Sequence, residues 1–139
     1  MKRLTGKVAV ITGAAGGIGQ VAASLFAAEG AQVLLVDLNE VGLQSAVQDI
    51  GSEAASYVLA DTTQPEQVQN YIDTAVERYG GIDILLANAG IEGELHPIPD
   101  YPVEVFDRVL AVNVRGVWLG LKYTIPVMGY RGGGSIIIT

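Results

Sequence analysis

The chain has 139 residues, 50% of them hydrophobic, with a formal net charge of −7 and no cysteine. This length fits about one domain with a single core, and the lack of cysteine excludes disulfides and thiolate metal sites. The acidic balance argues against nucleic acid or an anionic membrane as a partner, and no apolar run reaches the ~20 residues of a membrane-spanning helix. Too few residues precede the first predicted strand for a signal peptide, so we expect a cytoplasmic protein.

The first predicted element is a buried strand at residues 8–11, which breaks into glycines as Thr12-Gly13-x-x-x-Gly17-x-Gly19. A helix pattern resumes directly after them. Backbone N–H groups without neighbouring side chains, at the positive end of a helix dipole, form an anion site. After a buried strand, the expected anion is the pyrophosphate of a dinucleotide, held around Gly13, Gly17, Ile18 and Gly19. The glycines alone fit an ordinary loop equally well.

Strand and helix patterns then alternate along the chain. Helices are predicted at 20–29, at 40–50 with Asn39 as N-cap, at about 65–79 with a Thr63/Glu66 capping box, and at 103–128. Strands are predicted at 32–36, 55–59, 82–87 and 135–139, with an irregular, proline-rich stretch at 91–102. This order predicts an α/β fold: a doubly wound parallel sheet in three αβα layers, with residues 1–139 in one domain.

In a parallel sheet the carboxyl ends of all strands meet at one edge, where ligands bind. Asp37 ends the second strand, 20 positions after Gly17, where a carboxylate can accept both ribose hydroxyls of an adenosine and repel a 2′-phosphate. The alternative is a helix-capping acid. Position 38 is Leu, and positions 14 to 18 contain no cation for an extra phosphate, so NAD is favoured over NADP.

Polar residues also follow the third and fourth strands. Asp61 can meet the adenine amino group with help from the Thr62 backbone, although a turn residue before Thr63 fits nearly as well. In Asn88-Ala89-Gly90, two minimal residues let a flat ligand lie against the backbone while the Asn side chain braces neighbouring strands. Asn113 lies within an apolar helical run, so we expect a buried amide that either stabilises a helix kink or anchors an active-site water.

Together these motifs resemble the short-chain dehydrogenase/reductase family, in its branch of single-domain, Rossmann-fold oxidoreductases. The resemblance covers essentially the whole chain. It implies an NAD-dependent enzyme that interconverts an alcohol and a carbonyl, with small-molecule substrates and a catalytic Asn, Ser, Tyr and Lys. Asn113 would be the catalytic Asn, holding a water that links the lysine to solvent. The long helix around Trp118 and Leu121 would help to build a dimer or tetramer.

The sequence departs from the family pattern in one respect. None of its six tyrosines is followed four residues later by Lys, and Ser135 begins the fifth strand instead of following it. We therefore expect the chain to be the first part of a longer protein, with Ser, Tyr and Lys beyond Thr139. If they are absent there, the alternative is a non-catalytic dinucleotide-binding module, such as a redox sensor or scaffold. His96, the single histidine, is not expected to bind a metal.

Overall fold

A computed structural model describes residues 2–139 of the chain. Five parallel strands form one sheet in the order β3-β2-β1-β4-β5. Their bounds are β1 Val8–Thr12, β2 Gln32–Asp37, β3 Ala55–Leu59, β4 Ile84–Ala87 and β5 Ser135–Ile138. The order reverses at β1, with β2 paired on one side and β4 on the other. The predicted doubly wound parallel sheet is confirmed.

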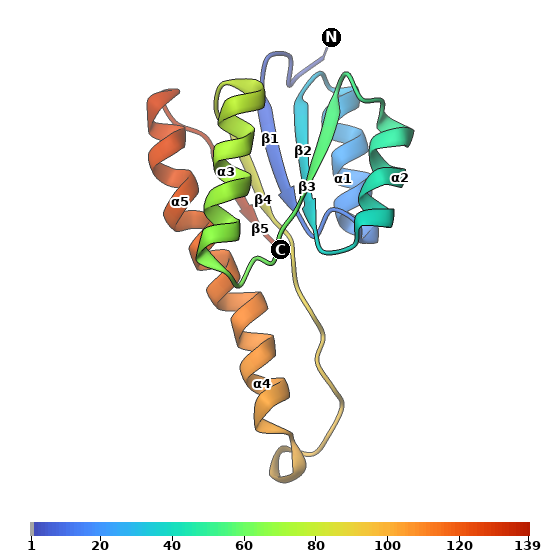
Figure 1. Ribbon diagram of the computed structural model, residues 1–139, viewed down its shortest axis with the longest axis vertical. Coiled ribbons are helices and arrows are strands. Elements are labelled where there is room, and N and C mark those ends of the chain that lie inside the picture. The colour runs from blue at the N-terminus through green and yellow to red at the C-terminus, as the bar shows by residue number, and fades with distance from the viewer. Residues whose placement is uncertain (1) are drawn as a thin grey trace.

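Helices cover both faces of this sheet, as Figure 1 shows. On one face α1 (Gly17–Ala28) and α2 (Glu40–Ile50) share a buried cluster with the sheet. On the other face α3 (Pro65–Tyr79) and α5 (Gly116–Tyr130) do the same. None of the helices within residues 2–139 is both long enough and apolar enough to cross a membrane.

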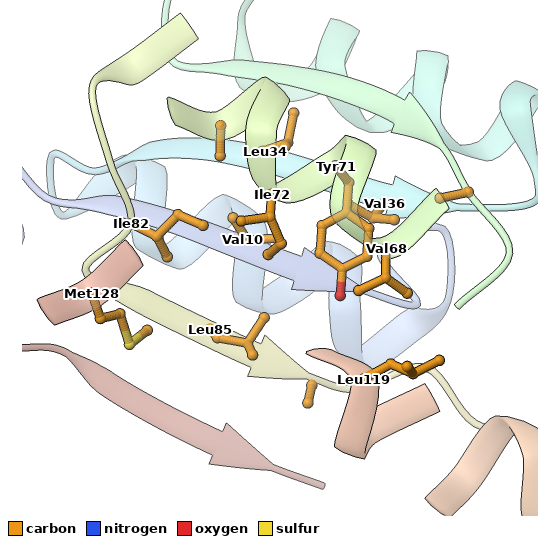
Figure 2. Packing of buried hydrophobic residues seen from close by; sticks show 13 residues of the cluster. Val10, Leu34, Val36, Val68, Tyr71, Ile72, Ile82, Leu85, Leu119 and Met128 are labelled. Atoms are coloured by element: carbon orange, nitrogen blue, oxygen red, sulfur yellow. The ribbon is translucent and has the colours of Figure 1, made fainter. Parts of the chain in front are cut away.

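The core follows from the apolar runs that the sequence places in the central strands. All five residues of β1 are buried, because helices pack on both faces of a parallel sheet. Successive side chains alternate between the two clusters: Val10 belongs to the α3/α5 side and Ile11 to the α1/α2 side. Figure 2 shows the first cluster, in which Ile72 of α3 lies beside Val10 and Tyr71 beside Val36. Full burial of a Val, Leu or Ile side chain contributes roughly 1.5–3 kcal/mol.

The helix predicted at 103–128 is divided into three segments. It consists of α4 (Val103–Leu110), a π-helical turn (Ala111–Arg115) and α5. α4 buries no residue, and together with the preceding irregular segment it projects away from the sheet (Figure 1). A short 3₁₀ helix, η1 (Ile98–Asp100), interrupts that segment. The π turn places the end of α4 beside the carboxyl edge of the sheet.

One predicted helix cap is confirmed and one is wrong. Asn39 Oδ1 accepts a hydrogen bond from Gly42 N–H (3.1 Å), as an N-cap should. The capping box does not form: α3 begins after Gln64, whose side chain makes no cap bond. The Thr63 hydroxyl instead donates to Asp61 Oδ1 (2.7 Å). The N-cap position is taken by Gln64, one residue after Thr63, so the Thr63 side chain belongs to the preceding turn and not to the helix end.

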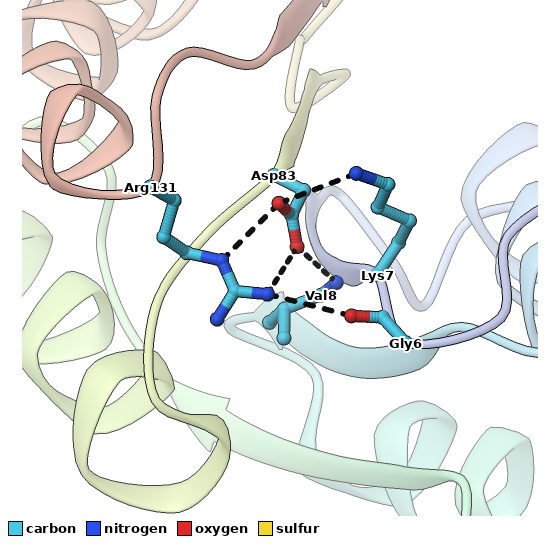
Figure 3. A network of polar contacts seen from close by, with 5 residues as sticks. All are labelled: Gly6, Lys7, Val8, Asp83 and Arg131. Atoms are coloured by element: carbon cyan, nitrogen blue, oxygen red, sulfur yellow. Dashed lines mark hydrogen bonds and ion pairs between the residues drawn. The ribbon is translucent and has the colours of Figure 1, made fainter.

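An ion-pair network joins the strands at their amino ends, opposite the edge described next. The carboxylate of Asp83, which is 8% exposed, accepts from Val8 N–H (2.8 Å) and from Arg131 (3.0 Å to Nη2). Lys7 Nζ lies 3.8 Å from the same carboxylate (Figure 3). These contacts bind the starts of β1 and β4 to the turn between α5 and β5.

Candidate functional site

The glycine turn after β1 depends on residues without a Cβ at two positions. Gly13 has φ +64°, and a Cβ there would lie 2.9 Å from Ala89 Cα. A Cβ on Gly19 would lie 2.8 Å from Ala14 Cα, so α1 packs directly on the turn. Both distances are shorter than side chains tolerate. The turn thus brings the start of α1 against the end of β1 and beside the segment after β4.

Three N–H groups at the start of α1 remain free to bind an anion. The preceding N–H groups of Ala14, Ala15 and Gly16 donate to Val36 O, Asp37 Oδ2 and Gly13 O. Within residues 2–139, the N–H groups of residues 17–19, which form the first turn of the helix, donate no hydrogen bond. A Cβ on Gly17 would meet nothing within 4 Å. The helix start is open, and its dipole favours negative charge.

Asp37 ends β2 and reaches across to this turn. Its Oδ2 accepts from Ala15 N–H at 3.0 Å, and its Oδ1 accepts from the N–H groups of Leu38 (2.7 Å) and Asn39 (3.1 Å). These three donors fix the direction of the carboxylate. A carboxylate has about four lone-pair directions, so it keeps acceptor capacity for a ligand hydroxyl. Asp37 does not cap a helix, because Asn39 is the N-cap of α2 and all three donors lie outside the helices, so the alternative of a helix-capping acid is wrong.

Asp61 divides its two oxygens in a similar way. Oδ1 accepts from the Thr63 N–H (2.9 Å) and hydroxyl (2.7 Å), which is the turn interaction that the sequence offered as an alternative. Oδ2 has no hydrogen-bond donor among residues 2–139. The Asp61 N–H donates to Gln67 Oε1 (2.6 Å), which holds this loop to α3. One carboxylate oxygen is thereby left for a ligand.

The segment Asn88-Ala89-Gly90 is braced against β1 as predicted. Asn88 Nδ2 donates to the carbonyl oxygens of Thr12 (3.2 Å) and Gly13 (3.3 Å). In return, Thr12 Oγ1 accepts from the N–H groups of Asn88 (3.0 Å) and Ala89 (3.1 Å). The ends of β1 and β4 form one rigid unit, with the small residues 89 and 90 beside the glycine turn.

Asn113 lies in the π-helical turn, but it is exposed, and the expectation of a buried amide is wrong. Both polar atoms of its side chain bond to one residue: Oδ1 accepts from Ile91 N–H (2.8 Å) and Nδ2 donates to Ile91 O (2.9 Å). The apolar neighbours of Asn113 in the sequence do not bury it, because α4 and the π turn project from the sheet. The kink itself is present as a π turn, a feature that is frequent at functional sites.

Most of the predicted site residues line a single cavity of about 150 Å³ at the carboxyl edge of the sheet. The predicted residues in its wall are Gly13, Asp37, Leu38, Asp61, Thr62, Ala89 and Gly90. Gly17, Ile18, Gly19 and Asn88 flank it through the turn and the strand brace. Asn113 reaches it through Ile91, which also lines the wall.

Four residues of this wall were not predicted: Ala60, Ile91, Arg108 and Val112. Arg108 and Val112 lie four positions apart, so they share one helix face, and this spacing is the one signal in the sequence that could have linked them. His96 bonds to Glu94 (2.9 Å) in the loop before α4. Within the described residues no group of three or more potential ligands could hold a metal ion.

Comparison with known proteins places this site in a family. The family model for short chain dehydrogenases matches residues 7–139, and the chain belongs to that family of oxidoreductases. The oxidoreductase YxbG of Bacillus subtilis (strain 168) is 45% identical over 142 residues, which cover 100% of this chain and 51% of that protein.

Solved structures agree with this assignment. An NAD⁺-bound xylitol dehydrogenase superposes with a TM-score of 0.93 at 36% identity, covering 97% of this chain and 53% of that one. A 3-ketoacyl-(acyl-carrier-protein) reductase from Brucella melitensis, complexed with NADH, gives 0.89 at 40% identity, with 93% and 53% covered. The fold is therefore the Rossmann fold of this family. The chain spans about half the length of the curated relatives it matches.

Proposed function

We propose that this protein is an NAD(H)-dependent oxidoreductase that interconverts an alcohol and a carbonyl by hydride transfer. The observation that carries the proposal is the convergence of three free N–H groups, two partly engaged carboxylates and a small-residue segment on one edge of the sheet. This set of groups matches the parts of a dinucleotide: an anionic pyrophosphate, a ribose diol and a flat base.

Each part of the cofactor has proposed partners in the chain. The N–H groups of Gly17, Ile18 and Gly19 would bind the pyrophosphate beside the turn at Gly13, whose missing Cβ lets Ala89 approach. The Asp37 carboxylate would accept the ribose hydroxyls. The proposed neighbours of the adenine base are Leu38, Asp61 and Thr62. The proposed neighbours of the nicotinamide half are Asn88, Ala89 and Gly90. When bound, the nicotinamide supplies or accepts the hydride.

NAD is the proposed cofactor in preference to NADP. The Asp37 carboxylate is held in one direction by the N–H groups of Ala15, Leu38 and Asn39, and in the proposed complex it would occupy the space that a 2′-phosphate needs. Placing a phosphate next to a carboxylate brings like charges together and leaves the carboxylate without a hydroxyl to bind. The relatives crystallised with NAD⁺ or NADH support the same choice.

Asn113 is the proposed catalytic residue within this chain. Its side chain closes on Ile91 beside Gly90, and a Cβ on Gly90 would lie 3.3 Å from its Oδ1. In the proposed role it holds a water in the path by which the reaction's proton reaches solvent. The Ser, Tyr and Lys that this chemistry requires are proposed to lie beyond Thr139.

We also propose a homo-oligomer. Phe106, Leu110, Val114 and Trp118 recur every four residues along α4, the π turn and α5, and each is 43–59% exposed. An apolar stripe of this kind fits a subunit contact. Light scattering on the intact protein tests it, and a monomer would contradict it.

The catalytic proposal is tested by following NADH absorbance while the purified intact protein is given a panel of alcohols with NAD⁺ and of ketones with NADH. Turnover with at least one small alcohol or carbonyl is expected. Tight NADH binding without turnover on any substrate would favour the non-catalytic dinucleotide-binding module. Failure to bind NADH would reject both.

A further inference from the structure

Arg108 is a cation in the wall of the carboxyl-edge cavity that the family motifs do not include. It comes from the last turn of α4, more than 70 residues after Asp37 in the chain, yet both line the same cavity of about 150 Å³. Within residues 2–139 its guanidinium makes no ion pair or side-chain hydrogen bond. An arginine without a partner in the wall of a small cavity is free to contact a ligand there.

Arg108 and Leu38 line the cavity from segments that lead into helices on opposite faces of the sheet. Leu38 leaves β2 toward α2, which covers one face of the sheet. Arg108 and Val112 precede α5, which covers the other face. The loop with Asp61 and Thr62, which follows β3, lines the same cavity. The lining thus combines two apolar side chains, Leu38 and Val112, with the Arg108 guanidinium.

We propose that Arg108 binds the adenine ring, stacking its planar guanidinium on the face of the purine opposite Leu38. This inference rests on the proposed dinucleotide function. A guanidinium is flat, weakly hydrated and attracted to aromatic faces, which suits it to such a wall. Asp61 lines the same cavity, and its Oδ2, which has no donor among residues 2–139, would accept from the amino group at the ring's edge. Arg108 therefore adds affinity for the base, independently of the pyrophosphate.

The test is a set of titrations of the intact protein with ADP and with inorganic pyrophosphate, each displacing NADH and followed by NADH fluorescence. Arg108→Ala is expected to weaken ADP binding about tenfold and to leave pyrophosphate binding unchanged. Arg108→Lys keeps the charge but not the plane, and it is expected to stay weakened. Arg3→Ala removes an equal charge at an exposed site, so it is the matched control and should bind ADP as the unmodified protein does.

Three outcomes would overturn the assignment of Arg108. The first is unchanged ADP affinity in Arg108→Ala. The second is an equal loss for ADP and pyrophosphate. The third is full recovery in Arg108→Lys, since the last two indicate a charge effect at a distance. In all three the unmodified protein still binds NADH, so the proposed function survives. If the unmodified protein binds neither NADH nor ADP, the proposed function itself fails.

Discussion

Asp37 at the end of β2 accepts a hydrogen bond from the N–H of Ala15, in the glycine turn after β1, over 3.0 Å. The bond connects the two loops that the proposed cofactor would touch, the pyrophosphate loop and the ribose loop. It removes one N–H group from the set available to phosphate and leaves the three at residues 17–19. The position of the Asp37 carboxylate, the proposed ribose contact, is therefore coupled to the geometry of the proposed phosphate site.

Replacing Asp37 with Asn should change cofactor choice. The amide keeps an acceptor for the N–H groups of Leu38 and Asn39 but loses the charge that opposes a 2′-phosphate. We expect weaker NADH binding and a NADH-to-NADPH preference reduced by about tenfold or more. Parallel fluorescence titrations with both nucleotides measure this, with Asp49→Asn on the exposed face of α2 as control. An unchanged preference would remove Asp37 from this role.

Asn113→Ala should loosen the segment after β4. The change removes both hydrogen bonds to Ile91, and because the site is exposed we expect a loss of only about 1 kcal/mol in the free energy of unfolding. Hydrogen exchange of the Ile91 amide should accelerate, since its acceptor is gone. Asn70→Ala, at an exposed position of α3, is the control. Unaltered Ile91 exchange would show that the pair does not form in solution.

Arg131→Met should destabilise the fold without affecting the cofactor. Asp83 would keep Val8 N–H and Lys7 but lose its charged hydrogen bonds from Arg131, at a cost of about 2 kcal/mol in urea unfolding. The NADH dissociation constant should not move, because this network lies at the opposite edge of the sheet. Arg3→Met, at an exposed ion pair, should leave stability unchanged. Equal effects of the two variants would contradict this account.

Tyr71 predicts a specific loss of stability at high pH. Burial raises the pKa of its phenol well above the ordinary value near 10. Above that value the unfolded phenol ionises while the folded one does not, so stability falls as pH rises, by up to about 1.4 kcal/mol per pH unit. Tyr71→Phe removes this contribution. Urea unfolding of both proteins at pH 8 and pH 11 should show a smaller alkaline loss for the variant, and identical losses would refute it.

The elements that the sequence predicted are those determined locally. The apolar run of β1, the glycine spacing and Asp37 at the end of β2 all follow from periodicity and turn chemistry, and each lies where it was expected. Family resemblance added Asn113 and the order of the motifs. The N-cap at Asn39 followed from residue type alone.

Features that depend on distant contacts could not be predicted. The partners of Asp83 come from 48 and 75 residues away, and no local pattern marks that carboxylate as buried. Helical periodicity through residues 103–128 conceals the π turn, which inserts one extra residue without changing composition. Arg108 could not be predicted, because α4 brings this cation to the cavity from a part of the chain far from the glycine turn and position 38.

The central claim, that the start of α1 binds the pyrophosphate of NAD(H), is tested most directly by calorimetric titration of NADH into Gly17→Ala and Gly129→Ala. At both positions a Cβ meets nothing within 4 Å, so neither change should lower the unfolding temperature. The account predicts that Gly17→Ala weakens NADH binding about tenfold or more, because its methyl group occupies the approach to the free N–H groups. Gly129→Ala, remote in α5, should bind normally. Equal NADH affinity in the two variants would contradict the claim.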